Sequence, residues 1–97
     1  MKFLEKNGQE LESSYPYTAK NGVCKEKKEI EKVNVKGIAN VKPDSELSLM
    51  AAIMKGPTSV TVEADKAVFQ RYNGGILNSP ACGTNLDHAI TAVGYGS

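Results

Sequence analysis

Apolar and polar positions change their period several times along the 97 residues, and each change predicts an element. After a helix start at 43–46, capped by Asp44 or Ser45, apolar residues recur at helical spacing until Gly56-Pro57 ends the helix. The residues expected on the buried face of this helix are Leu47, Met50, Ala51 and Met54. Polar and apolar residues then alternate over 59–64, which predicts a strand with two valines on one face.

The rest of the chain carries shorter patterns of the same kinds. Residues 1–7 resemble the end of a helix, with Gly8 in the usual stop position. Alternation at 32–41 predicts a strand in which Gly37 introduces a bulge. Three short elements are expected further along: a turn or helix at 65–72, a small strand at 76–77 and a last strand at about 87–95. The chain therefore mixes helices with strands.

Charge and composition exclude several classes of function. The net charge is +1, and the charged run at 25–32 mixes signs, so it predicts a solvated connection and no nucleic-acid partner. No apolar stretch approaches the about eighteen residues that span a membrane. The opening residues 1–4 are followed by polar residues where a signal peptide has its apolar core, so we expect neither a membrane contact nor a targeting signal in this chain.

The single histidine is the first candidate for chemistry. His88 lies at the mouth of the last apolar run, where a strand is expected. A histidine side chain ordinarily titrates near neutrality, so a positioned imidazole can act as a general base. A lone histidine also has an ordinary structural explanation, as a solvated or hydrogen-bonded side chain. A base by itself does not make an enzyme.

The two cysteines add little to this candidate when they are considered without any comparison. Cys24 and Cys82, with Asp87 and His88, are ligand types, but they lack the paired spacing of a metal site, so no metal or other cofactor is expected. Neither cysteine carries the surroundings of a thiolate nucleophile, which needs a base and an oxyanion-stabilising donor nearby. A disulfide between the two cysteines remains open at this point.

Six short motifs occur in a fixed order along nearly the whole chain. They are Tyr15-Pro16-Tyr17 before Cys24, Gly56-Pro57, the segment from Phe69 to Ile76, Cys82-Gly83, Asp87-His88-Ala89 and Gly94-Tyr95-Gly96. In this order and at about these spacings the chain resembles the papain-like cysteine proteases. The resemblance implies an α+β fold, a partial papain-like fold whose antiparallel β-barrel is incomplete, with one packed helix and an N-terminal helix remnant. It also implies that residues 1–24 are the tail of the helical left-hand domain and the crossover, and that residues 25–97 are the first part of the right-hand β-barrel domain.

The resemblance assigns a role to each candidate residue. His88 takes the place of the catalytic histidine, and Asp87 shapes the cleft surface beside it. The pocket for the substrate side chain second on the N-terminal side of the scissile bond is expected to be lined by Thr61, Leu86 and Ala89. These residues are small or apolar and imply an apolar preference. The positions matching disulfide half-cystines in the parent protein are Cys24 and Cys82, and the resemblance places the partner of each outside this chain.

The resemblance also identifies what this sequence lacks. The nucleophile of the family lies in a Cys-Gly-Ser-Cys-Trp type motif roughly 130–150 residues before its histidine. An asparagine in an Asn-Ser-Trp-Gly motif normally follows the Gly-Tyr-Gly strand. We therefore expect a fragment of a cysteine endopeptidase that hydrolyses peptide bonds by a Cys-His thiolate mechanism. Such a fragment would carry only the catalytic histidine and be inactive alone.

The expected partners of the fragment are a peptide or protein substrate and the missing halves of the protease. The intact parent would be lysosomal, vacuolar or secreted. The alternative is a non-catalytic barrel-domain module that binds a partner or self-associates, because an incomplete sheet leaves apolar surface and an open strand edge. The coding sequence on either side of residues 1–97 separates these two hypotheses.

Overall fold

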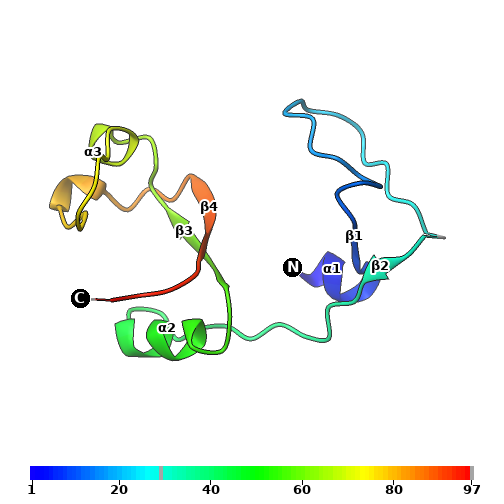
Figure 1. Ribbon diagram of the computed structural model, residues 1–97, viewed down its shortest axis with the longest axis horizontal. Coiled ribbons are helices and arrows are strands. Elements are labelled where there is room, and N and C mark those ends of the chain that lie inside the picture. Colours follow the sequence, from blue (N-terminus) through cyan, green and yellow to red (C-terminus); the bar gives the residue numbers. More distant parts are fainter. Residues whose placement is uncertain (29, 97) are drawn as a thin grey trace. The chain divides into compact units, whose positions relative to one another are not determined.

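The structure is a computed structural model that describes residues 1–28 and 30–96, in two compact units, Met1–Asn40 and Val41–Ser97. Its elements are α1 (Lys2–Asn7), β1 (Gln9–Glu10), β2 (Lys32–Val33), α2 (Glu46–Ile53), β3 (Thr58–Val62), α3 (Ala67–Gln70), the 3-10 helix η1 (Pro80–Cys82) and β4 (His88–Ala92) (Figure 1). Among the described residues the strands form two antiparallel pairs, β1 with β2 and β3 with β4. The expected α+β fold is confirmed, and the strands within residues 1–28 and 30–96 form no closed barrel.

The first unit is built around the stop of α1. The helix ends at Gly8, whose N–H donates to the carbonyl oxygen of Leu4 at 2.7 Å, as expected for the glycine after a helix. The chain then forms β1, which pairs with β2 in the register Gln9↔Val33. The strand expected over 32–41 is restricted to two residues. Its partner β1 is itself only two residues long, and backbone groups without a partner strand make no ladder.

The helix α2 begins where the sequence predicts, but its half-buried side differs from the side that the sequence predicts. Ser45 is the N-cap, and its hydroxyl oxygen accepts from the N–H of Ser48 at 3.3 Å. Of the expected buried face, Leu47 is 78% exposed and Met54 is 73% exposed, and Ala51 is exposed too, whereas Met50 is half-buried together with Leu49. The prediction was wrong for three of its four residues because α2 is apolar nearly all round. Its sequence therefore does not determine which side packs.

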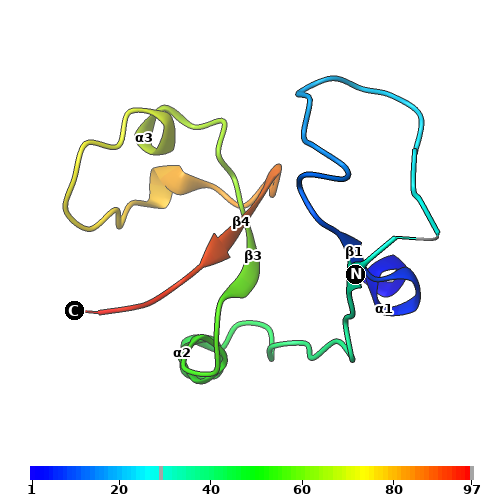
Figure 2. The same ribbon diagram turned by 45° about the vertical axis from the view of Figure 1, so that its right-hand side comes forward.

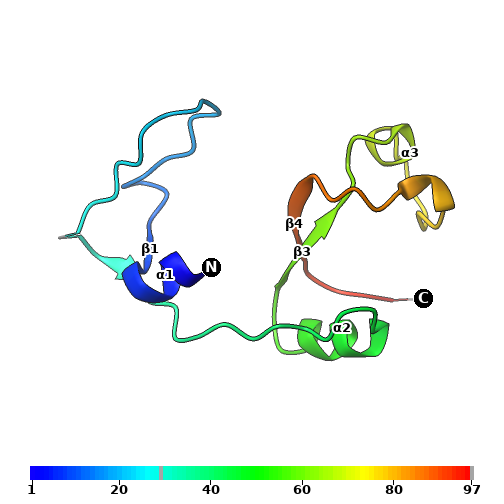
Figure 3. The same cartoon turned by 180° about the vertical axis from the view of Figure 1, so that it is seen from behind.

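The pair β3–β4 is the longest ladder in the structure, with Val60 opposite Ile90 and Val62 opposite His88. In two different views α3 and η1 lie together beside the end of the ladder where β3 finishes and β4 begins (Figures 2 and 3). A small strand was expected at 76–77, but this segment forms none. Ile76 is 83% exposed and has no neighbouring strand among the described residues.

The described residues bury no apolar side chain, and the buried side chains that they contain are those of Glu10 and Glu63. No helix in the described ranges is both long and apolar enough to cross a membrane. The predicted boundary between residues 24 and 25 concerns the domains of the parent family. The two units of this chain do not test it, and it stays a prediction.

Candidate active site

His88 is the first residue of β4 and lies directly opposite Val62, the last residue of β3. Its side chain is exposed and borders an open surface depression. The depression is lined by Ala64, Asp65, Phe69, Gln70, Asp87 and His88. Residues of α3 and of the loop after β3 thus lie around the imidazole, and a ligand in this depression would contact the only histidine of the chain.

The backbone just before His88 is tied to the end of β3. The N–H of Asp87 donates to the carbonyl oxygen of Val62 at 3.1 Å. In the opposite direction, the N–H of Ala64 donates to Oδ1 of Asp87 at 2.7 Å. Because these bonds join segments more than twenty residues apart, they fix where β4 begins and therefore where the imidazole is attached.

A second carboxylate belongs to the same junction. Glu63 follows β3 directly, is 6% exposed, and accepts from the N–H of Asn85 through Oε2 at 2.6 Å. Its Oε1 lies 2.8 Å from Nζ of Lys66. These two contacts, the Lys66 ammonium first and the Asn85 amide second, hold the pKa of the Glu63 carboxyl below its ordinary value.

The pKa of Lys66 shifts in the direction opposite to that of Glu63. The hydrogen bond to Glu63, and then the charge of Asp65, raise the pKa of Lys66 above its ordinary value. Asp65 lies 3.6 Å from the same ammonium and is largely exposed. The junction beside His88 is therefore a charged cluster in which Glu63 remains ionised at neutral pH.

The residues predicted to line the substrate pocket occupy a different place from the depression. Thr61 and Ala89 lie directly opposite one another in the ladder and are exposed. Successive side chains of a strand point to opposite faces, so this pair lies on the face away from His88 and Val62. Leu86 is 59% exposed in the loop before β4. Of the predicted substrate residues, only Asp87 lines the depression with His88.

The two cysteines lie in different units, and neither forms a disulfide within the described residues. Cys82 ends η1 and is half-buried. Cys24 is exposed and borders a small hollow of the first unit, together with Phe3, Leu4 and Tyr15. The roles predicted for both as half-cystines of the parent protein stay predictions.

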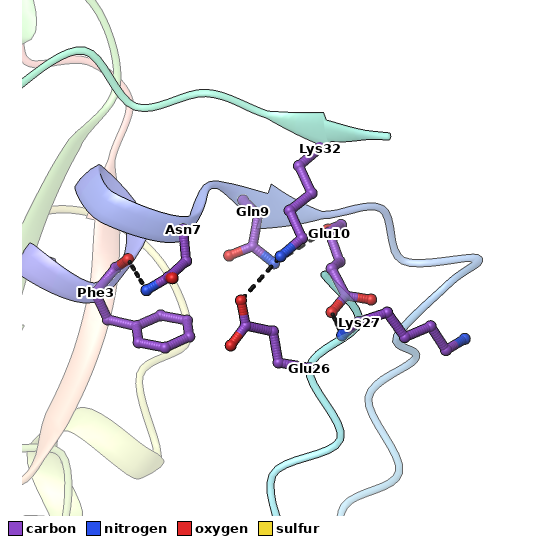
Figure 4. Close-up of polar contacts among 7 residues, drawn as sticks. All are labelled: Phe3, Asn7, Gln9, Glu10, Glu26, Lys27 and Lys32. Atoms are coloured by element: carbon purple, nitrogen blue, oxygen red, sulfur yellow. Dashed lines mark hydrogen bonds and ion pairs between the residues drawn. The ribbon is translucent and has the colours of Figure 1, made fainter. Parts of the chain in front are cut away.

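Polar contacts around that hollow stabilise the first unit. Nζ of Lys32 lies 2.9 Å from Oε1 of Glu26, and the N–H of Lys27 donates to Oε1 of Glu10 at 2.8 Å (Figure 4). The other oxygen of Glu10, Oε2, is buried and accepts no hydrogen bond from the described residues. Within residues 1–28 and 30–96 no three histidine, cysteine or acidic side chains come together as a metal site.

Sequence reasoning missed Glu63. In a strand with its valines facing inward, the alternating period places residue 63 on the outward side, so a buried acid was not expected there. The one indication in the sequence is Lys66, three residues after Glu63. Acidic and basic residues at this spacing are too common on protein surfaces to identify a buried carboxylate. The contact that matters, with Asn85, joins residues 22 positions apart.

Comparison with known proteins identifies the class of this chain. The model of the family "Papain family cysteine protease" matches residues 1–97. The chain therefore belongs to the papain family of cysteine proteases.

Among individual relatives, caricain from Carica papaya is 47% identical over 99% of this chain and 28% of its own length. Mexicain from Jacaratia mexicana is 44% identical over 99% of this chain and 45% of its length. The chain thus spans less than half the length of these relatives.

Solved structures show the same likeness in three dimensions. The Carica candamarcensis cysteine protease CMS1MS2 in complex with E-64 matches with a TM-score of 0.86 at 37% identity, over 98% of this chain and 45% of that one. The bromelain protease from Ananas comosus in complex with the E64 inhibitor matches with a TM-score of 0.82 at 40% identity, over 98% of this chain and 44% of that one. The fold of this chain therefore matches that of papain-family structures.

Proposed function

We propose that this chain supplies the acid/base histidine, and part of the substrate cleft, of a papain-type cysteine endopeptidase. One observation carries the proposal. The only histidine of a chain matched throughout by the papain family is exposed at the start of β4, beside an open depression. An imidazole in such a place can reach both solvent and a substrate.

In this proposal a cysteine thiolate from outside residues 1–97 attacks the carbonyl carbon of a peptide bond. The protonated His88 then gives its proton to the leaving amine, and afterwards takes a proton from the water that releases the acyl group. This chemistry needs no metal or cofactor. Neither Cys24 nor Cys82 is proposed as the nucleophile, so the 97-residue chain by itself is expected to be inactive.

The proposed substrate is a peptide or protein. Thr61, Leu86 and Ala89 would line an apolar pocket for the side chain second on the N-terminal side of the scissile bond, and Asp87 would shape the adjoining cleft. The two matched structures hold the inhibitor E-64, which supports a ligand cleft in this fold. A lysosomal, vacuolar or secreted location of the parent protein, and disulfides at Cys24 and Cys82 there, belong to the same proposal.

The proposal is tested by grafting. Residues 1–97 replace the matching segment of mexicain, and hydrolysis of a fluorogenic dipeptide is measured for the chimera and for the 97-residue chain alone. We expect turnover by the chimera and none by the chain alone. His88→Ala in the chimera should lower kcat/KM by roughly 10²–10⁴-fold, the usual contribution of a general acid/base.

A matched control is Glu46→Gln, a neutralising change in the exposed first turn of α2, which should leave turnover unchanged. The proposal is wrong if a folded chimera shows no turnover, or if His88→Ala hydrolyses the dipeptide as fast as the parent chimera. Turnover by the 97-residue chain alone would show that a thiol within it serves as the nucleophile.

A second candidate function is association with another polypeptide, either the missing halves of the protease or a second copy. The observation that favours it is the exposure of large apolar side chains. Those above 75% exposure are Tyr17, Val23, Leu47, Ile76 and Val93. Exposed apolar surface and the unpaired edges of a two-stranded sheet both favour binding to another chain.

A further inference from the structure

The least expected side chain beside His88 is the buried carboxylate of Glu63. Its side chain is 4% exposed, whereas that of the neighbouring Asp65 is 56% exposed. Removing a charged group from water is costly unless partners replace the water. The chemistry proposed above does not use this carboxylate, so its burial needs a separate explanation.

The partners of Glu63 come from the loop that leads into β4. Oε2 accepts the Asn85 N–H at 2.6 Å, a short bond of the charge-assisted kind. The backbone of Gly83 packs so close to the same carboxylate that a Cβ at position 83 would overlap Oε2. One side chain at the end of β3 therefore bonds to Asn85 and packs against Gly83 in the loop before His88.

This contact runs alongside the one made by Asp87. The N–H of Ala64, just after β3, donates to the Asp87 carboxylate at 2.7 Å. The segment after β3 and the segment before β4 therefore each supply a carboxylate that accepts a backbone N–H of the other segment. Asp87 fixes the residue next to His88, and Glu63 fixes the chain two residues further upstream. Without the Glu63 contact, the segment before β4 would keep only the two hydrogen bonds that Asp87 makes, and the chain upstream of Asp87 would lose its link to the end of β3.

We propose that Glu63 is a positioning residue for His88, holding the loop 83–87 through the Asn85 N–H so that the imidazole stays in place for the proposed peptide hydrolysis. The inference deepens the proposed function and rests on it. Glu63 touches neither substrate nor the reacting atoms, and it acts through the backbone.

The competing explanation is a merely stabilising ion pair with Lys66. The ammonium side of this pair is 46% exposed, and exposed ion pairs contribute little to stability. The two explanations differ in which change disturbs His88. If the ion pair matters, Lys66→Ala should act like Glu63→Ala. If the bond to Asn85 matters, Lys66→Ala should leave the loop in place.

The test uses amide hydrogen exchange and the NMR signals of His88 in the mexicain chimera, because residues 1–28 and 30–96 bury no apolar side chain of their own. For Glu63→Ala we expect at least about tenfold faster exchange at Asn85 and a shift of the His88 ring signals, since loss of the acceptor frees the donor. Glu63→Gln keeps an oxygen at that place and should restore most of the protection. Lys66→Ala should leave the Asn85 and His88 signals near those of the parent chimera.

Acid titration gives a second readout. Because Lys66 and the Asn85 amide lower the pKa of Glu63, its charged form stabilises the folded junction above the ordinary pKa of 4.5, and this contribution is lost as pH falls through the lowered value. Asp65, Asp87, Lys66 and His88 are the other titratable groups around the junction. The titration is therefore followed at the side-chain carboxyl carbon of Glu63. We expect the protection of the Asn85 amide, taken relative to its intrinsic exchange rate at each pH, to fall only in part on protonation, because the neutral carboxyl, like the amide of the Glu63→Gln variant, still presents an acceptor oxygen.

In the mexicain chimera, Glu63→Ala should lower kcat by about tenfold or more with KM nearly unchanged, since small displacements of a catalytic group are costly. The inference is overturned if Glu63→Ala leaves Asn85 exchange and the His88 signals as they were, or if Lys66→Ala disturbs them equally. If Glu63→Ala also abolishes the NMR signals of α2, the unit Val41–Ser97 has unfolded. The Glu63→Gln and Lys66→Ala variants then decide between the two explanations. A chimera without turnover contradicts the proposed function alone, because the exchange measurements need no activity.

Discussion

Gly83 has a backbone conformation that residues with a side chain rarely adopt, at φ 73° and ψ −177°. Its position against the Glu63 carboxylate adds a second restriction, because a Cβ there would overlap Oε2. Gly83, in the loop before His88, is thus restricted both by its backbone angles and by the nearby Glu63 carboxylate. The effect of adding a methyl group at this position is therefore predictable.

Gly83→Ala should destabilise the β3–β4 junction by about 1–3 kcal/mol, the usual cost of a residue with a side chain in this region of backbone angles. The measurement is native-state hydrogen exchange of the β3 and β4 amides. The matched control is Gly94→Ala, because a Cβ at position 94 meets nothing within 4 Å and the backbone angle there is not restricted. Equal effects of the two changes would contradict the account of Gly83.

At the residue scale, sequence reasoning identified His88 and missed Glu63. His88 was found because it is the only histidine and lies in a recognisable motif, both of which are local properties of the chain. Glu63 has no motif of its own. Its burial depends on Asn85 and Gly83, which approach only after β3 and β4 have paired.

At the scale of elements, the ladder β3–β4 is the framework that presents the candidate site. Its half-buried side chains alternate along both strands, and Val60 and Ile90 face each other at its centre. Directly opposed side chains are the unit of stabilisation in an antiparallel pair.

A double-mutant cycle between Val60→Ala and Ile90→Ala should give a coupling free energy of about 0.2–1 kcal/mol. It is measured from the hydrogen-exchange stability of the ladder amides in the two single variants and the double variant. Thr61→Ala combined with Ile90→Ala is the control, because Thr61 lies opposite Ala89 and on the other face. Additive effects in the Val60–Ile90 cycle would contradict the register described here.

The elements also show where sequence patterns fail. The start of α2 followed from a cap predicted at Asp44 or Ser45, since capping involves only neighbouring residues, and the structure identifies Ser45 as that cap. The buried face of α2, the length of the strand after residue 32 and the expected strand at 76–77 were wrong. Each of these depends on which other segment lies alongside, and the spacing of apolar residues within one segment does not contain that information.

At the scale of the whole molecule, the absence of any buried apolar side chain among the described residues is the dominant feature. Burial of apolar surface is the main favourable contribution to folding. A chain that leaves this surface in water has a strong tendency to bind something else.

We therefore expect the purified 97-residue chain to self-associate as its concentration rises, and to bind a dye that reports exposed apolar surface. Analytical ultracentrifugation of the chain with both thiols blocked separates this association from disulfide cross-linking through Cys24 and Cys82. Leu47→Glu, on the exposed side of α2, should weaken the association, and Glu46→Gln beside it should not. A monomer at every concentration, without dye binding, would contradict the prediction.

The sequence by itself determined the family, the α+β class, the glycine that ends α1, the approximate positions of α1, α2, β3 and β4, and the histidine of the candidate site. These depend on local spacing, on single residues and on short motifs, which are present before the chain folds. Only the tertiary structure decided which face of α2 is exposed, how short β2 is, and that Glu63 is buried against Asn85 and Gly83. The physical reason is that burial and hydrogen bonding at these places require residues distant in the chain to meet, and the energy of each contact exists only once they do.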